Sequence, residues 1–268
     1  MTTPVFIGNW KMNFVSKDIS SFFSSFIPLL SEIYHSESNL ESNDPDFSVG
    51  FAVPAPYIGL ASSLTRELVD TKILIGSQNI HWAKEGAHTG EISVPMIMDL
   101  GASFSLIGHS ERRSLYGETS ENVAKRALFC LQSNITPVIC IGETREQFEN
   151  GETRSVLDEQ LKLSLANIPT KDISRLIIAY EPVWAIGTGL SATPKEAEFA
   201  HENIRTFLLE KYGNISTTSH PPILYGGSVT AENARELANV KEISGFLVGG
   251  ASLKPDTFLE IVKSWKWF

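Results

Sequence analysis

The residue that most directly suggests chemistry is Glu181, which directly follows the apolar run RLIIAY and precedes Pro182. A carboxyl group at the end of an apolar run is partly removed from water, which raises its pKa and makes its carboxylate a stronger base. Downstream, Pro182 stiffens the chain, whereas Gly187 and Gly189 leave it conformational freedom. The pattern predicts a general base followed by a lid, over residues 182–192, that closes on a substrate.

The same segment also matches the dinucleotide-binding fingerprint G-x-G-x-x-G/A, over residues 187–192. In that motif the first glycine lies at the turn directly after a strand, where the backbone approaches a pyrophosphate. Here the six residues 181–186 intervene, and the bulky side chains of Pro182 and Trp184 stand where close approach is needed. The sequence therefore favours a lid over a nucleotide cofactor site.

Two more groups of polar residues follow apolar runs. Asn9 and Lys11 come after the first run, one residue apart, so their side chains point to the same side of an extended segment. An amide beside a cation suits an anion or a developing oxyanion. His109 follows the fourth run and precedes Ser110, a favourable helix N-cap. The positive end of such a helix favours a neutral imidazole that can donate a hydrogen bond.

The elements that must position these residues are visible as eight short apolar runs separated by longer helix-like segments. The runs are VFIG, FSVGFAV, KILIGS, SFSLIG, TPVICIG, RLIIAY, PPILYGG and SGFLVGG. Apolar runs without alternation are typical of parallel strands that are covered on both faces. Eight such units in 268 residues predict an α/β fold, a (β/α)8 TIM barrel, as a single domain over 1–268. A doubly wound open sheet is the alternative. The polar stretch 35–46 is expected to be a solvated loop on the face opposite the site.

If the fold is a barrel, two glycine-rich segments lie at positions that often bind phosphate. Gly226, Gly227 and Ser228 follow the seventh run, and Gly249 and Gly250 follow the eighth. Glycines let backbone N–H groups approach a phosphate, and in (β/α)8 barrels the loops after strands 7 and 8 frequently form a phosphate site. The two segments together therefore predict phosphate binding at the same mouth as Glu181.

Composition narrows the class of protein. A net charge of −9 argues against nucleic acid or an acidic membrane surface as a partner. The two cysteines, Cys130 and Cys140, provide neither a disulfide framework nor metal-ligand spacing. The chain shows no signal-peptide pattern and no apolar run of roughly 18 residues, the length of a membrane span. We expect a globular cytoplasmic protein.

Six motifs together resemble triosephosphate isomerase in order and spacing, from about Val5 to Leu253. They are GNWKMN, IGHSERR, CIGE, AYEPVWAIGTG, YGGSV and GFLVGGASL. The resemblance implies interconversion of dihydroxyacetone phosphate and D-glyceraldehyde 3-phosphate through an enediol(ate). Two alternatives remain open: another sugar-phosphate isomerase or epimerase on this fold, and a catalytically silent relative. The silent relative is disfavoured because a barrel without catalytic activity need not keep all four of the polar residues Asn9, Lys11, His109 and Glu181.

Mapped residue by residue, the resemblance implies that Glu181 is the base and His109 the neutral electrophile. It implies that Asn9 and Lys11 face the substrate's oxygens and charge, with the Glu111 carboxylate close to the lysine. The backbone donors that hold the phosphate would be Gly187, Ser228, Gly249 and Gly250. Closure of the lid would keep water from the intermediate. No cofactor and no metal ion are expected, because proton transfer needs only a placed base and an oxyanion site.

The resemblance also implies a homodimer through the loop Gln78–Glu91, which in the family reaches into the partner near its catalytic lysine. Thr89 and Glu91 fit the family pattern, whereas His88 stands where Phe or Tyr is usual. The segment 80–82, Ile-His-Trp, is also unusual. The role of His88 at the interface is left open by the sequence.

Overall fold

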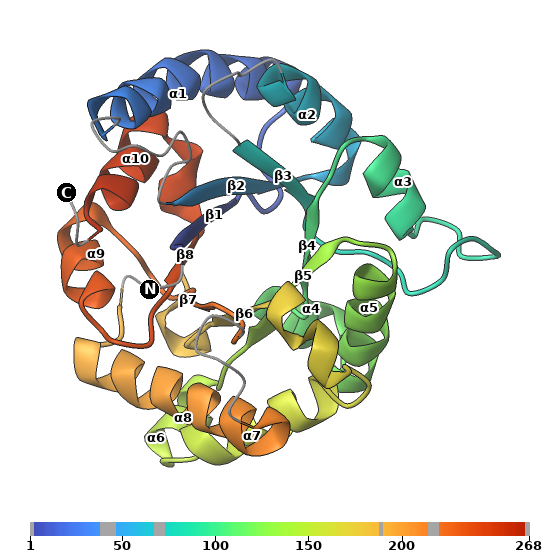
Figure 1. The fold of residues 1–268 in the computed structure, drawn as a ribbon, viewed down its shortest axis with the longest axis vertical. Helices are drawn as coiled ribbons and strands as arrows, with labels where there is room; N and C mark the ends of the chain where they lie inside the picture. Colours follow the sequence, from blue (N-terminus) through green and yellow to red (C-terminus); the bar gives the residue numbers. More distant parts are fainter. Residues whose placement is uncertain (1–2, 38–46, 67–72, 188–189, 214–219, 266–268) are drawn as a thin grey trace.

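A computed structural model shows the strands of this chain closed into one parallel barrel in chain order, β1 to β8 (Figure 1). The structure describes residues 3–37, 47–66, 73–187, 190–213 and 220–265. The strands are β1 Val5–Asn9, β2 Ser48–Val53, β3 Ile73–Ser77, β4 Phe104–Ile107, β5 Thr136–Ile141, β6 Ile177–Tyr180, β7 Ile223–Tyr225 and β8 Gly245–Val248. β1 pairs with β8, with Val5 opposite Gly245, so the barrel is closed and the open-sheet alternative is wrong.

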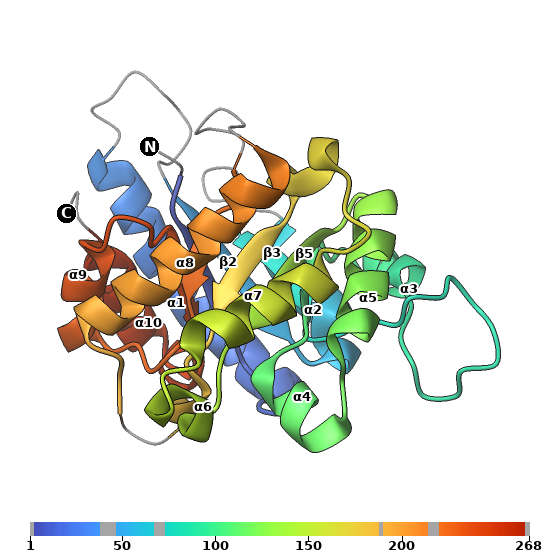
Figure 2. The same cartoon turned by 90° about the horizontal axis from the view of Figure 1, so that it is seen from below.

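Helices surround the barrel and connect each strand to the next (Figures 1 and 2). The α-helices are α1 Ser16–Glu37, α2 Ile58–Arg66, α3 Val94–Asp99, α4 Ser110–Tyr116, α5 Ser120–Gln132, α6 Arg145–Glu149, α7 Thr153–Ser164, α8 Pro194–Tyr212, α9 Ala231–Ala238 and α10 Pro255–Lys263. Short 3-10 turns are η1 Ala55–Tyr57, η2 Thr170–Arg175, η3 Val183–Ala185 and η5 Gly250–Leu253. α1 includes the first residues of the predicted polar loop 35–46, and 38–46 lie outside the described residues.

The hydrophobic core has two layers because strand side chains point alternately into the barrel and towards the helices. The inner layer consists of Ile7, Ala52, Phe104, Leu106, Val138, Cys140, Ala179, Leu224 and Leu247. The outer layer lies between strands and helices and includes Cys130. Burial on both faces explains why the strand sequences are continuously apolar.

Since all strands run in the same direction, their carboxyl ends meet at one mouth of the barrel. The segments after β1, β4, β6, β7 and β8 therefore converge there. Within the described part of the chain, no group of three His, Cys, Asp or Glu side chains could hold a metal ion, and no helix is long and apolar enough to cross a membrane.

Candidate active site

The barrel mouth contains a pocket of about 420 Å³ that brings together residues from five strand ends. Eight of the nine predicted site residues line it: Asn9, Lys11, His109, Glu181, Gly187, Ser228, Gly249 and Gly250. The ninth, Glu111, lines a neighbouring pocket of about 350 Å³. Asn9 ends β1, and Glu181 directly follows β6, so the strands themselves fix the amide and the carboxylate.

Glu181 is 2% exposed, and both of its carboxylate oxygens have partners. Oε1 lies 2.9 Å from Nε2 of His109, and Oε2 accepts a 3.0 Å hydrogen bond from the backbone N–H of Ser110. Burial raises the pKa of Glu181. The imidazole of His109 and the N–H of Ser110 lower it by more than burial raises it, so the pKa lies below its ordinary value. The raised basicity predicted from the sequence is therefore wrong for this arrangement.

His109 caps α4 with its own side chain, because Nδ1 accepts a 3.3 Å hydrogen bond from the N–H of Glu111. The prediction of Ser110 as N-cap was wrong: Ser110 is the first helical residue. Since Nδ1 accepts, a neutral ring carries its proton on Nε2, which faces Glu181. Burial lowers the pKa of His109, but the Glu181 carboxylate outweighs it, and the pKa is raised. The sequence predicted that the helix end would lower the pKa of His109, whereas pairing with Glu181 raises it.

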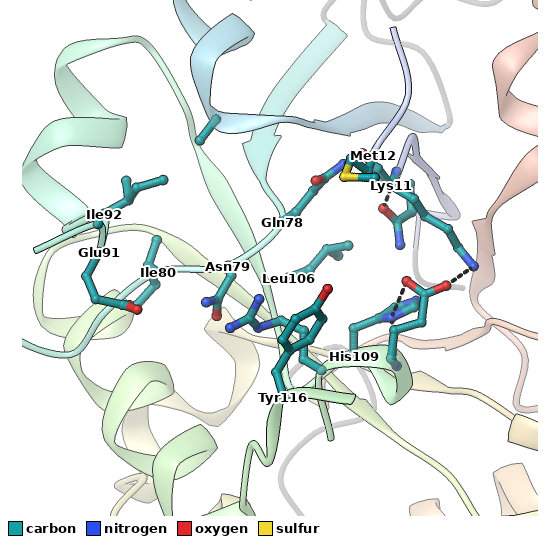
Figure 3. A pocket seen from close by; sticks show the side chains of 15 residues that line it. Lys11, Met12, Gln78, Asn79, Ile80, Glu91, Ile92, Leu106, His109 and Tyr116 are labelled. Atoms are coloured by element: carbon teal, nitrogen blue, oxygen red, sulfur yellow. Dashed lines mark hydrogen bonds and ion pairs between the residues drawn. The ribbon is translucent and has the colours of Figure 1, made fainter. Parts of the chain in front are cut away.

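Both the backbone and the side chain of Lys11 make polar contacts that fix its position. Its φ is 50°, in the left-handed region that non-glycine residues rarely adopt. Its N–H donates to Oδ1 of Asn9 at 3.0 Å, and its carbonyl accepts from Nε2 of Gln78 at 2.7 Å. Nζ lies 2.6 Å from Oε1 of Glu111, as the resemblance implied (Figure 3). Gln78, directly after β3, has a role here that sequence reasoning missed.

The glycines of the mouth serve close packing. A Cβ on Gly226 would lie 3.0 Å from Cγ of Glu181, and one on Gly227 would lie 2.3 Å from the hydroxyl oxygen of Tyr225. Gly249, by contrast, has only Cε of Lys11 nearby, at 3.7 Å. Gly226 therefore lets the β7 end approach the Glu181 side chain and Gly227 leaves room for the Tyr225 ring, while the β8 end lines the pocket with Gly249 and Gly250.

The described ends of the predicted lid are both anchored to the barrel. Glu143, which is fully buried, accepts hydrogen bonds from the Tyr180 hydroxyl at 3.0 Å and from Nε1 of Trp184 at 2.9 Å. At the other end the Ala192 N–H donates to the Tyr225 hydroxyl at 3.1 Å. Burial raises the pKa of Glu143. Sequence reasoning assigned no role to this glutamate, although it is the last residue of the CIGE motif at the end of β5.

The segment predicted to be a lid continues into helix α8, which begins where the sequence predicted. Thr193 is the N-cap, with a capping box to Glu196, and Pro194 is the first helical residue. Gly187, at the lid tip, has a φ of 70°, which explains the need for glycine there. Thr188 and Gly189 lie outside the described residues.

The neighbouring pocket shares Asn9, Lys11 and His109 with the first (Figure 3). Its rim carries Met12, 96% exposed, and Tyr116, 70% exposed. Beside it, the segment between β3 and α3 projects from the barrel in both overall views (Figures 1 and 2).

Comparisons with known proteins agree over nearly the whole chain. Residues 4–265 match the family model described as triosephosphate isomerase. Relatives named "Triosephosphate isomerase" include those of Solibacter usitatus, Alkaliphilus oremlandii and Ruthia magnifica. They are 41%, 39% and 42% identical to this chain, and the matches cover 98% of this chain and 99%, 99% and 100% of the relatives.

Proposed function

Because the chain belongs to the triosephosphate isomerase family, and so to the isomerases of triose phosphates, we propose that the pocket around Glu181 carries the reaction through an enediol(ate). The observation that supports this assignment is the buried carboxylate placed 2.9 Å from an imidazole, in a pocket that also contains Lys11. A base, a hydrogen-bond donor and a cation are the groups that proton transfer beside a carbonyl requires.

In the proposed reaction Glu181 takes a proton from one substrate carbon and returns it to the next. To do so the carboxylate must leave His109 and the Ser110 N–H. The imidazole then loses Glu181, the partner that raises its pKa most; burial and Lys11 still lower the pKa, and Glu111 still raises it. Its Nε2–H becomes available to the carbonyl oxygen. This enzyme family is a known example of such acid–base tuning by environment.

The remaining groups bind and enclose the substrate. Lys11, held by Glu111, and Asn9 would stabilise negative charge on the oxygens. The phosphate would accept hydrogen bonds from backbone N–H groups of Gly187, Ser228, Gly249 and Gly250. Closure of the lid 182–192 would exclude water, since an exposed enediolate phosphate eliminates its phosphate. The chemistry needs neither metal ion nor cofactor, because the base and the donors come from the chain.

A coupled assay with D-glyceraldehyde 3-phosphate, run beside other sugar phosphates, tests this proposal. Glu181→Gln should keep the fold and lose about 3 kcal/mol or more of transition-state stabilisation, because an amide cannot accept the proton. Glu149→Gln, on the exposed surface of α6, is the control and should match wild type. Near-wild-type turnover of Glu181→Gln would reject the assignment.

We also propose that a second copy of the chain inserts its loop 78–91 into the 350 Å³ pocket. The exposed rim residues Met12 and Tyr116 and the projecting loop support this homodimer. Tyr116→Glu should shift sedimentation towards the monomer, whereas Phe199→Glu, a substitution of an exposed aromatic residue on α8, should not. Equal sedimentation of both variants and wild type would count against the interface.

A cytoplasmic location is proposed as well. Cys130 and Cys140 are free and buried, as is usual for a protein of a reducing compartment. Fluorescence imaging of the tagged full chain tests the location, and a signal outside the cytoplasm would contradict it.

A further inference from the structure

A glutamine on α7 makes a two-point contact with the segment that follows β5. Nε2 of Gln160 donates to the carbonyl of Gly142 at 2.9 Å, and Oε1 accepts from the N–H of the same residue at 2.9 Å. Because the backbone donor and acceptor are fixed, the orientation of the side-chain amide is fixed too. Only a side chain that both donates and accepts can make this contact.

Gly142 in turn packs against the backbone of the proposed base. A Cβ at this position would lie 1.7 Å from the carbonyl oxygen of Glu181, so the two backbones lie closer together than any residue with a Cβ would allow. The N–H of Glu181 donates to the carbonyl of Ile141 at 2.8 Å. The base is therefore placed by the segment that Gln160 holds.

The next residue of that segment places the start of the lid. The carbonyl of Glu143 accepts from the N–H of Val183 at 3.1 Å, and its carboxylate accepts from Nε1 of Trp184 at 2.9 Å. One short segment thus contacts both the base and the first turn of the lid.

We propose that Gln160 is a positioning residue for proton transfer, acting through Gly142 on Glu181 and through Glu143 on the lid. Gln160 lines neither pocket, so it does not touch the substrate. Water can replace its two hydrogen bonds but cannot hold the segment against Glu181. A displacement of about 1 Å at a reacting group can cost about 100-fold in rate. The proposal rests on Glu181 being the base.

Gln160→Leu and Gln160→Glu test the proposal, with kcat and KM measured per folded enzyme. We expect kcat to fall about 10- to 100-fold in both variants at pH 8. KM should change less than kcat does, because three of the four proposed phosphate donors, Ser228, Gly249 and Gly250, lie on segments that Gln160 does not hold. The carboxyl introduced by Gln160→Glu donates only when protonated, near pH 4.3 for an ordinary glutamate. Its kcat relative to wild type should therefore recover as the pH is lowered towards about 5, whereas that of Gln160→Leu should not.

Tyr212→Phe is the matched control, because Tyr212 also binds backbone carbonyls, those of Leu165 and Ile168, but where the strands begin. It should leave kcat unchanged. Wild-type kcat in both Gln160 variants would overturn the proposal, even if their thermal stability fell, and so would the absence of pH-dependent recovery in Gln160→Glu. If Glu181 is not the base, Glu181→Gln will turn over substrate at a near-wild-type rate, and this result is independent of the Gln160 variants. If Gln160→Leu does not fold, the pH profile of Gln160→Glu still decides.

Discussion

Gly142→Ala is expected to reduce turnover out of proportion to its effect on folding. The added Cβ would lie 1.7 Å from the Glu181 carbonyl oxygen, and this atom belongs to the backbone, which cannot rotate away. The two segments must separate by about 1.3 Å merely to reach 3.0 Å, the lower limit for real Cβ contacts. The carboxylate of Glu181 moves with its backbone.

The expected magnitudes follow from that displacement. A shift of about 1 Å at a reacting group can cost about 100-fold in rate, so we expect kcat to fall by about that factor. Overpacking of a dense interior costs about 1–3 kcal/mol of folding free energy. The variant should therefore remain folded in buffer and lose most of its activity, which a coupled assay and urea unfolding measure together.

Gly245→Ala provides the matched control. Its Cβ would lie 1.9 Å from the carbonyl oxygen of Val5, again between neighbouring strands, but where β8 and β1 begin. The φ of 139° adds backbone strain, so the stability loss should be at least as large as that of Gly142→Ala. Its kcat per folded molecule should stay within a few-fold of wild type. Equal kcat losses in the two variants, or wild-type kcat in Gly142→Ala, would refute the reasoning.

Three further predictions concern buried charge. In Glu181→Gln the pKa of His109, followed by NMR, should fall relative to wild type, because the carboxylate that raises it is gone; an unchanged pKa would contradict the pairing. Glu118→Gln should cost about 3–5 kcal/mol in urea unfolding, because it leaves the buried Arg126 unpaired, and a loss below about 1 kcal/mol would contradict this. The pKa of His81 is lowered, by burial first and then by a neighbouring imidazole. The unfolded chain therefore binds this proton at a higher pH than the folded one, near pH 6.5. The free energy of unfolding should fall as the pH drops below about 6.5, and less so in His81→Gln.

The fold was predictable because its signal is local. Seven strands fall within an apolar run and β1 extends one residue past its run, to Asn9, since a strand covered on both faces cannot alternate. Even β7, with only three residues, lies inside PPILYGG. The short turn η3 was not predicted, because it depends on how the mouth packs and no periodic pattern marks it.

The positions of the site residues were predictable from the sequence, but the contacts between their side chains were not. A residue directly after a strand must lie at the mouth, which places Glu181 and His109 there from sequence alone. Their contact was not visible, because it joins two strand ends that are far apart in the chain. The same limit applies to Gln160, whose role depends on an amide reaching from α7 to the β5 end. The position of a single residue was readable from the sequence, whereas its pairing required the fold.

The pairing of Glu181 with His109 also changes how its basicity must arise. A carboxylate that is 2% exposed would be costly to ionise without partners, and the imidazole together with the Ser110 N–H offsets that cost. The same partners lower the pKa of the carboxyl group and so weaken it as a base. Strong basicity requires that the carboxylate leave both partners while it stays out of water. Burial, the largest influence on its pKa, then raises it, opposed by the more distant charge of Lys11. We therefore expect the substrate and the closed lid, rather than the fold by itself, to make Glu181 a strong base.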